Sequence, residues 1–374
     1  MTQTKVEAPF VENNAHFKNL IINGDFRIFQ RASSSTAVGN GTYSTADRFK
    51  TNFSNDGAAT TQQHTLSDAD RATTGHSFAW QWDCGTADGT IASNQSAYFR
   101  HFIEAQNCSG LAYGSSAAKT LTLSFWVKSA KTGTYSCTVE KDDSTKYLLP
   151  LEYAISSADT WEHKTLVISP TAGSTSLITG SAGDIAQDNG KGITLYWWLA
   201  AGSDITGGTN NTWGSNTDNL TTTNQVNWLD STSNDFYITG IQLEVGSTAT
   251  DFEHLPHDVQ LARCQRYYQQ IPHTSSASWQ AYPLWGVNAN VMSTRLPISV
   301  VMRAAPTAAF VGTRNTDFNV YYNGGNQTLT GESATDTTDD AVRFDMSSSG
   351  GFAANGAGGL YIGSNGRITL NAEL

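Results

Sequence analysis

Alternating hydrophobic and polar residues dominate the first two thirds of the chain. In LTLSFWVKS at 121–129 every second residue is apolar, and in ITLYWWLA at 193–200 both phases are apolar. A period of two is typical of β-strands, because successive side chains point to opposite faces of a sheet. The same pattern predicts further strands at 78–84, 134–140 and 161–168.

These runs have the length of strands and are separated by stretches rich in Gly, Asn, Ser and Thr, without long helical periodicity between them. Such a chain favours an all-β fold, an antiparallel jelly-roll β-sandwich, over a parallel α/β sheet. Two polar stretches, 54–76 and 202–225, are predicted as long loops, which in compact domains are usually functional or disordered.

A closing strand is predicted in FYITGIQLEVG, where Ile241, Leu243 and Val245 alternate with Gln242 and Glu244. Ile241, Leu243 and Val245 should therefore face the core, and the two polar residues should face water.

A short connecting helix is predicted at 256–272, since Pro256 suits a first turn and Pro272 stops the helix. Its two adjacent tyrosines point about 100° apart, so that one could pack on its own domain while the other meets a neighbouring chain. The alternative is that both cap their own domain. The residues expected at such an oligomer interface are Leu261, Cys264, Tyr267, Tyr268 and Ile271.

The pattern therefore divides the chain into an extended N-terminal arm (1–17), a jelly roll (18–255), the helix (256–272) and a second, smaller antiparallel β domain (273–374). The arm could be a frayed terminus or a docking peptide that orders on a partner. Strand candidates in the last domain are 297–303, 308–311, 318–322, 341–346, 360–362 and 367–371.

Composition and charge narrow the function classes. The net charge is −11 and no basic cluster is visible, which argues against binding of nucleic acid or of an anionic membrane surface. We expect no membrane insertion, because no apolar run reaches 18 residues, and no conventional signal peptide. The four cysteines show no CxxC pairing and are expected to be reduced structural thiols.

One loop has the residue types that capture sugars. Trp213 lies in the polar stretch 202–225 near Asn211, Asn216 and Asp218, and Trp228 could join it. Aromatic faces stack on the C–H faces of sugars, while amides and carboxylates satisfy hydroxyls. The alternative is that Trp213 anchors the loop on the sandwich.

A second aromatic set, Tyr98, Trp126 and Trp198, has the phase of a sheet's other face. These rings could line a concave groove or pack beneath loops.

No catalytic or metal-binding constellation is recognisable. The chain has no GxSxG, HExxH, P-loop or Rossmann glycine motif. The paired aspartates at 142–143 and 339–340 fit solvated turns, and His254 and His257 alone are a weak metal signal. We therefore expect a protein that is not an enzyme and holds no cofactor and no metal.

Three segments, NLIINGDF at 19–26, LTLSFWVKSAKTG at 121–133 and FYITGIQLEVG at 236–246, together resemble carbohydrate-binding-module-like jelly rolls. The resemblance implies that the first and last strands pair. Such modules often hold a structural calcium through an Asp in the last strand, where this chain has Thr239 and Gly240. Asp25 and Glu244 could still supply oxygen ligands.

More specifically, NLIINGDFRIFQR at 19–31 and QLEVGSTATDFEHLPHDVQLARCQRYYQQ at 242–270 resemble a module of phage tail-fibre and related virion proteins. MRAAPTAAF at 302–310 and the final ITLNAEL resemble their C-terminal domains. The resemblance implies a virion component, assembled in the host cytoplasm, that forms a homotrimer. It is expected to contact other virion proteins through residues 1–17.

The leading expectation is therefore a tail-fibre or receptor-binding protein that attaches to a host surface glycan. One alternative is a capsid decoration, knob or other virion component that binds no glycan. A second is a polysaccharide depolymerase, which would need a carboxylate pair about 5–10 Å apart in a groove. A third is the carbohydrate-binding module of a secreted enzyme.

Overall fold

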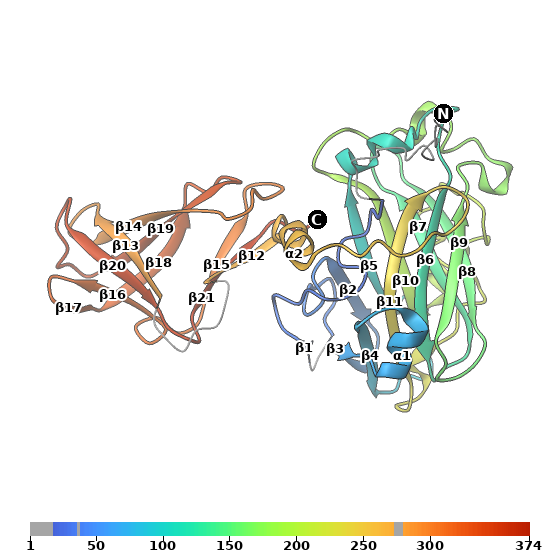
Figure 1. The fold of residues 1–374 in the computed structure, drawn as a ribbon, viewed down its shortest axis with the longest axis horizontal. Coiled ribbons are helices and arrows are strands. Elements are labelled where there is room, and N and C mark those ends of the chain that lie inside the picture. The colour runs from blue at the N-terminus through green and yellow to red at the C-terminus, as the bar shows by residue number, and fades with distance from the viewer. Residues whose placement is uncertain (1–17, 36–37, 273–279) are drawn as a thin grey trace, which may run out of the picture.

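The computed structural model describes residues 18–35, 38–272 and 280–374, so the predicted arm at 1–17 lies outside the described residues. Two β domains are joined through the helix α2 (His257–Gln265), and the C-terminus returns to the side of that helix (Figure 1). Every pair of neighbouring strands is antiparallel within the described sheets. The predicted fold class, a jelly-roll sandwich followed by a helix and a smaller β domain, is confirmed.

The jelly roll consists of two facing sheets. The six-stranded sheet contains, in spatial order, β1 (Ser34–Ser35), β3 (Ala58–Thr65), β4 (Phe78–Thr86), β11 (Asp235–Val245), β6 (Leu121–Ser129) and β9 (Glu162–Ile168). The five-stranded sheet contains β2 (Phe49–Ser54), β5 (Ser96–Glu104), β10 (Lys191–Ala201), β7 (Gly133–Lys141) and β8 (Tyr147–Ile155). Short 3₁₀ helices lie in the connections: η1 (Ala105–Leu111), η2 (Ala172–Ser174), η3 (Ser181–Gly183), η4 (Ser203–Ile205) and η5 (Trp228–Asp230).

The core between these sheets is filled by the predicted apolar phases. The alternate residues of β6 from Leu121 to Val127 are fully buried. Trp197 of β10 stacks on Phe99 of β5 with their ring centroids 5.4 Å apart. Burying such rings and aliphatic chains supplies the apolar area that stabilises a sandwich of this size.

The predicted loop at 54–76 is wrong, because it contains strand β3 and helix α1 (Asp68–Thr74). Ser67 caps α1 by accepting a hydrogen bond from the Asp70 amide, and Gly75 ends it in the left-handed conformation. β3 is polar and only partly buried, so its sequence lacks the hydrophobic alternation by which strands are recognised. The other polar stretch, 202–225, is a loop apart from η4.

The face of β11 predicted to be wet is buried. Gln242 and Glu244 are 1% and 2% exposed, whereas Val245, predicted to be inside, is 50% exposed. The chain after the strand folds back over this face: Thr250 donates its amide hydrogen to Glu244 Oε1 at 2.9 Å, and Glu253 donates its own to Gln242 Oε1 at 2.8 Å. Two buried polar side chains are tolerated because their hydrogen bonds are satisfied.

The opening segment 19–26 lies along β11 as the resemblance implies, but it does not form the predicted strand. Leu20 donates its amide hydrogen to the Leu243 carbonyl at 3.0 Å, and Ile241 donates to the Gly24 carbonyl at 2.9 Å. Asn23 has a φ of 64°, a left-handed conformation that interrupts any extended run.

The predicted helix 256–272 is shorter than expected. It ends at Gln265, and Tyr268–Ile271 instead forms strand β12. β12 pairs with β21 (Arg367–Asn371), which continues to β15 (Thr307–Val311) in a three-stranded sheet. Aromatic and β-branched residues such as Tyr268 and Ile271 favour strands, and pairing with β21 outweighs the helical spacing.

The second sheet of the C-terminal domain has seven strands. In spatial order they are β17 (Gly325–Gln327), β16 (Phe318–Tyr322), β20 (Ala357–Ile362), β13 (Gln280–Gly286), β14 (Val291–Pro297), β19 (Ala341–Ser348) and β18 (Leu329–Thr335). The candidate strand 297–303 is wrong, because the chain leaves β14 at Pro297. Ile298 and Met302 are buried from a loop instead. The other five candidates fall within strands.

The residues predicted to join chains are largely used within this chain. Tyr267 and Tyr268 are 1% and 6% exposed and Cys264 is fully buried. The guanidinium of Arg48 lies 3.3 Å from the Tyr267 ring centroid, and that of Arg31 lies 3.7 Å from the Tyr268 ring centroid. Both rings therefore pack against arginines of the jelly roll in the same chain. Leu261 and Ile271 are half-buried against apolar clusters of the same chain.

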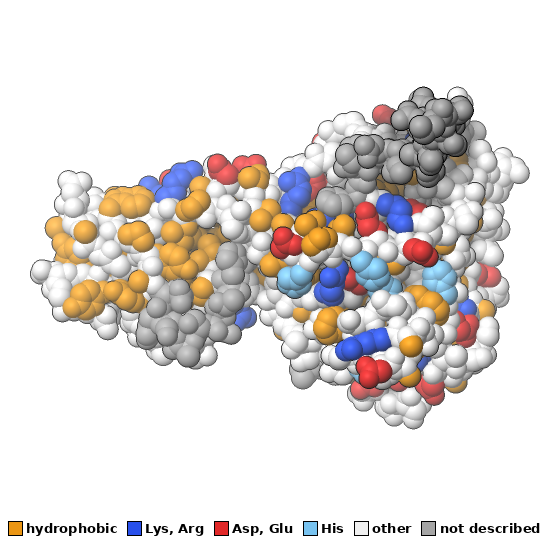
Figure 2. Space-filling view, in the orientation of Figure 1, with side chains coloured by type: hydrophobic (Ala, Val, Ile, Leu, Met, Phe, Trp, Pro, Cys, Tyr) orange, Lys and Arg blue, Asp and Glu red, His pale blue; other side chains and the backbone are white. Residues whose placement is uncertain are grey.

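All four cysteines are buried and unpaired. Within the described ranges, no helix has the length and apolarity needed to cross a membrane. Figure 2 shows hydrophobic side chains over much of the visible face of the C-terminal domain, whereas the visible face of the jelly roll carries more charged and histidine side chains.

Acid should destabilise the jelly roll through His76. Burial, with smaller contributions from His254 and Arg27, lowers the pKa of His76 to about 3. In the unfolded chain the pKa is about 6.5, so from there down to pH 3 the unfolded state binds a proton that the folded state does not. Stability should fall by about 1.4 kcal/mol per pH unit from this group. Denaturant unfolding of His76→Gln should show a shallower pH slope than wild type, while His257→Gln, at an exposed site, should not.

Candidate glycan-binding site

The two loop tryptophans face the core of the jelly roll. Trp213 is 2% exposed and donates its indole hydrogen to the Ser169 carbonyl at 2.8 Å. Trp228 is fully buried and donates to the Asp235 carbonyl at 2.9 Å. Neither indole offers a free ring face to a sugar, so Trp213 follows the alternative interpretation and anchors its loop.

The polar members of that predicted site remain at the surface. Asn211, Asn216 and Asp218 are exposed. Asn216 accepts a hydrogen bond from the Asp218 amide at 3.1 Å, which tightens the loop. Because the tryptophan between them points inward, the structure does not bring these residues together with an aromatic platform.

The second aromatic set is divided between the two sheets. Trp126 lies on β6 beside His163, on the outer face of the six-stranded sheet. Tyr98 and Trp198 lie on the outer face of the five-stranded sheet with ring centroids 4.3 Å apart. Trp198 is covered and donates to Thr138 Oγ1 at 3.0 Å, so only the half-buried Tyr98 ring has an exposed part.

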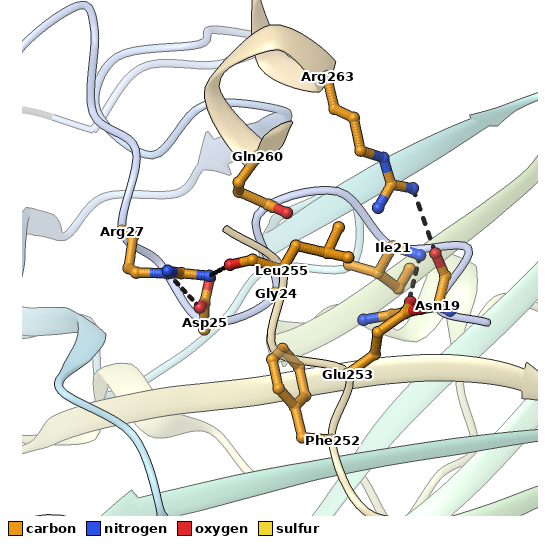
Figure 3. Close-up of a pocket in the computed structure, with 10 residues that line it drawn as sticks. All are labelled: Asn19, Ile21, Gly24, Asp25, Arg27, Phe252, Glu253, Leu255, Gln260 and Arg263. Carbon is orange, nitrogen blue, oxygen red and sulfur yellow. Dashed lines mark hydrogen bonds and ion pairs between the residues drawn. The ribbon is translucent and has the colours of Figure 1, made fainter. Parts of the chain in front are cut away.

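A pocket at the start of the jelly roll is filled by its own lining. It lies between the opening segment and the chain around α2 (Figure 3). Arg27 pairs with Asp25 at 2.5 Å and donates to the Leu255 carbonyl at 2.8 Å. The remaining space does not hold a water molecule. The Arg27 contacts join the opening segment of the domain to the chain that follows β11. The pocket has no room for a ligand.

The two suggested calcium ligands are engaged elsewhere. Asp25 pairs with Arg27, and Glu244 accepts hydrogen bonds from Gln242 and Thr250. No group of three or more His, Cys, Asp or Glu side chains in the described ranges is arranged to hold a metal ion.

An open groove lies on the C-terminal domain. It has a volume of about 350 Å³ and is lined by Asn319, Tyr321, Asn326 and Tyr361. Tyr321 is 44% exposed, and its ring centroid is 6.3 Å from that of Tyr361 at an interplanar angle of 73°. The volume is at the lower end of the range for small-molecule sites, and all four lining side chains are uncharged.

Strand register explains why these residues converge. On β16, Phe318 and Val320 point into the core, so Asn319 and Tyr321 point outward. Asn326 of β17 is paired with Tyr321, and Tyr361 of β20 is paired with Asn319. The four side chains therefore come from three adjacent strands and share the outer face of the seven-stranded sheet.

An exposed indole lies on the same face of the sheet, outside the groove lining. Gly359 lies between Tyr321 on one side and Pro283 on the other, and carries no side chain. Trp285, 44% exposed, lies two residues beyond Pro283 on the same face. Two strand spacings separate β16 from β13, about 10 Å.

The chemistry of the groove suits carbohydrate. The exposed ring of Tyr321 and the half-buried ring of Tyr361 can stack on sugar C–H faces. The Asn326 amide can donate to and accept from hydroxyls, and Asn319, whose amide nitrogen donates to the Thr316 carbonyl at 3.4 Å, keeps a second N–H and its oxygen. Within the described residues, no hydrogen bond occupies the Asn326 side chain or either tyrosine hydroxyl. The sequence signal for this site was the outward phase of FNVYY at 318–322, which our sequence analysis identified as a strand and not as a platform.

No family model and no curated protein matches this chain. Among solved structures, it is similar to a protein from Bacteroides thetaiotaomicron whose own description proposes sugar binding, with 13% identity, a TM-score of 0.34, and coverage of 61% of this chain and 100% of that one. It is also similar to the enzymatically active domain of tailspike protein 4 of bacteriophage CBA120, with 11% identity, a TM-score of 0.29, and coverage of 61% and 22%.

A third similar structure is the module TmCBM61 in complex with β-1,4-galactotriose, with 11% identity, a TM-score of 0.28, and coverage of 62% of this chain and 100% of that one. At these TM-scores no residue role carries over to this chain.

Proposed function

We propose that this chain is a carbohydrate-binding attachment protein of a phage particle, and that the groove formed by Asn319, Tyr321, Asn326 and Tyr361 binds a glycan of the host surface. The observation that carries the proposal is the convergence of the exposed Tyr321 ring, the half-buried Tyr361 ring and two asparagine amides in one open groove. A core role explains neither the exposure of Tyr321 nor the unoccupied amide of Asn326.

The virion role rests on the resemblance of 19–31 and 242–270 to tail-fibre modules. In this proposal the arm at 1–17 contacts other virion proteins, and the chain forms a homotrimer in the particle. A shallow groove binds one glycan weakly, and three copies raise the overall avidity by linking the binding events. Trimer contacts would use surfaces other than Cys264, Tyr267 and Tyr268, which are buried within the chain. Sedimentation of the purified protein tests the trimer.

Removing the tyrosine rings should abolish most glycan binding. We expect the Tyr321→Ala, Tyr361→Ala double variant to lose at least about tenfold in affinity for host surface polysaccharide, since each ring contributes stacking area. The Tyr321→Phe variant keeps the ring and should retain most affinity. Titration calorimetry or a glycan-array readout measures the difference.

The control is Val301→Ala, which shortens an exposed apolar side chain on the same domain. Equal polysaccharide binding by wild type and the double alanine variant would refute the groove. A particle component that binds no host polysaccharide would support the decoration-protein alternative, and immunolabelling of particles would show where the chain lies.

A further inference from the structure

The outer face of the five-stranded sheet of the jelly roll carries an unusual set of cations. Lys50 of β2, Arg100 of β5 and Lys191 of β10 all approach the ring of Phe102. The Lys191 and Lys50 ammonium nitrogens are 4.4 Å and 5.7 Å from the ring centroid, and the central guanidinium carbon of Arg100 is 5.0 Å from it. Three positive charges therefore lie around one ring in a chain whose net charge is −11.

The carboxylates of this face pair with cations outside this set: Glu104 with Arg266 at 2.9 Å, and two others with Lys146. Lys146 pairs with Glu140 at 2.6 Å and with Asp142 at 3.2 Å. Glu140 also accepts the hydroxyl hydrogen of Tyr196, and Asp142 accepts that of Thr194 at 2.9 Å. None of the ion pairs among described residues includes any member of the cation cluster formed by Lys50, Arg100 and Lys191.

The cluster carries unused hydrogen-bonding capacity. The Arg100 Nε–H is buried and has no partner among the described residues, and the nearest polar contact of its Nη1 is the Tyr196 hydroxyl at 3.5 Å. Burial and the charges of Arg100 and Lys191 lower the pKa of Lys50. A cation–π contact accounts for one cation over a ring, whereas three like charges repel one another. The carboxylates of Asp142 and Glu140 act on Lys191 and that of Glu373 acts on Lys50, yet burial and the neighbouring cations leave the pKa of both lysines lowered.

The position of the cluster leaves it accessible. Lys50, Arg100 and Lys191 are each half-buried, with stems on the sheet and charged ends toward its outer side. The exposed part of Tyr98 lies on the same face, and the Arg100 guanidinium is 5.7 Å from the Tyr98 ring centroid. An aromatic edge beside three cations suits a ligand that combines a sugar ring with an anionic group.

We propose that this cluster is a second binding site, specific for the anionic substituent of an acidic saccharide, either a carboxylate or a phosphate. Phe102 is 1% exposed and its ring face is electron-rich, so the anion would bind on the solvent side of the three cations and offset their mutual repulsion. The adjacent Tyr98 would contact the sugar ring. The site lies on the jelly roll, whereas the tyrosine–asparagine groove lies on the C-terminal domain, so the two can fail independently.

The test uses ligands that differ only in charge. Trigalacturonic acid and its methyl ester, and galactose 6-phosphate and galactose, are titrated into the full chain by calorimetry at low ionic strength. We expect each acid that fits the site to bind at least about tenfold tighter than its neutral counterpart, with the preference decreasing as salt is added. The pair that shows the preference distinguishes a carboxylate from a phosphate.

The variant Lys50→Gln, Lys191→Gln removes two charges and keeps much of each stem over Phe102. It should reduce the preference for the acid to about twofold or less. The matched control is Lys119→Gln, Lys128→Gln, which removes two charges outside the cluster and includes Lys128 of β6, a lysine over the rings of Trp161 and Tyr237. This control should keep the full preference.

Equal binding of acid and neutral ligand by wild type, no binding of either acid, or an unchanged preference in Lys50→Gln, Lys191→Gln would each overturn the proposal. Thermal unfolding shows whether that variant is folded, and Lys50→Gln alone should give a partial loss if the double variant is not. The Tyr321→Ala, Tyr361→Ala variant should keep the acid preference, which separates this site from the proposed groove.

Discussion

Replacement of Glu373 by Gln is expected to destabilise the protein by about 3–5 kcal/mol, the cost of leaving a buried charge without its partner. Glu373 pairs with Arg48 and, at 3.2 Å, with Arg31. The Arg48 side chain is completely buried, and that of Glu373 is 4% exposed. The variant has nearly the same shape, so that the change in charge dominates its effect.

Arg48 depends on this carboxylate. It also donates to the Phe102 carbonyl at 2.7 Å and lies on the Tyr267 ring, but neither partner carries a negative charge. Burial alone would lower the pKa of Arg48, but the Glu373 carboxylate together with Tyr267, Tyr43 and Cys264 outweighs this effect, so the pKa is raised. Arginine does not lose its proton in proteins. In the variant, therefore, either the Arg48 charge stays buried without its partner, or the C-terminal residues move away from the jelly roll.

The measurement is denaturant unfolding followed by tryptophan fluorescence. Every tryptophan except Trp279 and Trp285 precedes α2, so the signal reports mainly on the jelly roll. Lys131→Gln is the matched control, since it removes a partly exposed ion pair with Asp230 and should cost about 0–1 kcal/mol. If Glu373→Gln unfolds at the same denaturant concentration as wild type, the pair does not hold the C-terminal residues to the jelly roll.

Strands with a buried apolar phase could be predicted from the sequence. The 121–129 run coincides with β6, and the 193–200 run lies within β10, because in both the period of two is produced by large apolar side chains that the core requires. Where long-range contacts decide burial, the pattern misleads. Glu244 is polar and its face is nevertheless covered, because the chain at 250–253 returns over it.

The sequence of the 54–76 stretch contains a local signal for a helix. Ser67 with Asp70 three residues later is an N-terminal capping pattern, and Gly75 is a typical helix end, so α1 could have been recognised from its caps despite its lack of apolar residues. β3 carries no such signal, because it is stabilised by backbone pairing with β4 and not by an apolar face of its own.

The sequence predicted the residue types of a sugar site, aromatic rings with asparagine amides, but it placed them in the wrong loop. Tryptophan has a larger apolar surface than tyrosine, so its burial is more favourable. Trp213 and Trp228 are accordingly buried in the core of the sandwich. Tyr321 stays outside because Phe318 and Val320 fix the phase of β16. The groove depends on register across β16, β17 and β20, which a single sequence does not specify.

Gly24→Ala should destabilise the jelly roll by about 3 kcal/mol, since the added methyl has no room and the backbone must move. A Cβ at this position would lie inside contact distance of the Ile241 carbonyl oxygen, at a separation that real Cβ atoms do not show. The obstacle is backbone on a central strand, so no side-chain rotation relieves it. The opening segment would have to withdraw from β11 and break the hydrogen bond from Ile241 to Gly24.

Gly89→Ala is the matched control, because a Cβ there meets no atom within 4 Å. Its stability should be unchanged or slightly increased, through the smaller conformational entropy of the unfolded chain. Hydrogen exchange would locate the effect: in Gly24→Ala the amides of Leu20 and Ile241 should lose protection, while those of the C-terminal strands keep it. Unchanged protection at both amides would mean that the opening segment does not close the sandwich, and the likeness of 19–26 to the first strand of a jelly roll would then have no structural role in this chain.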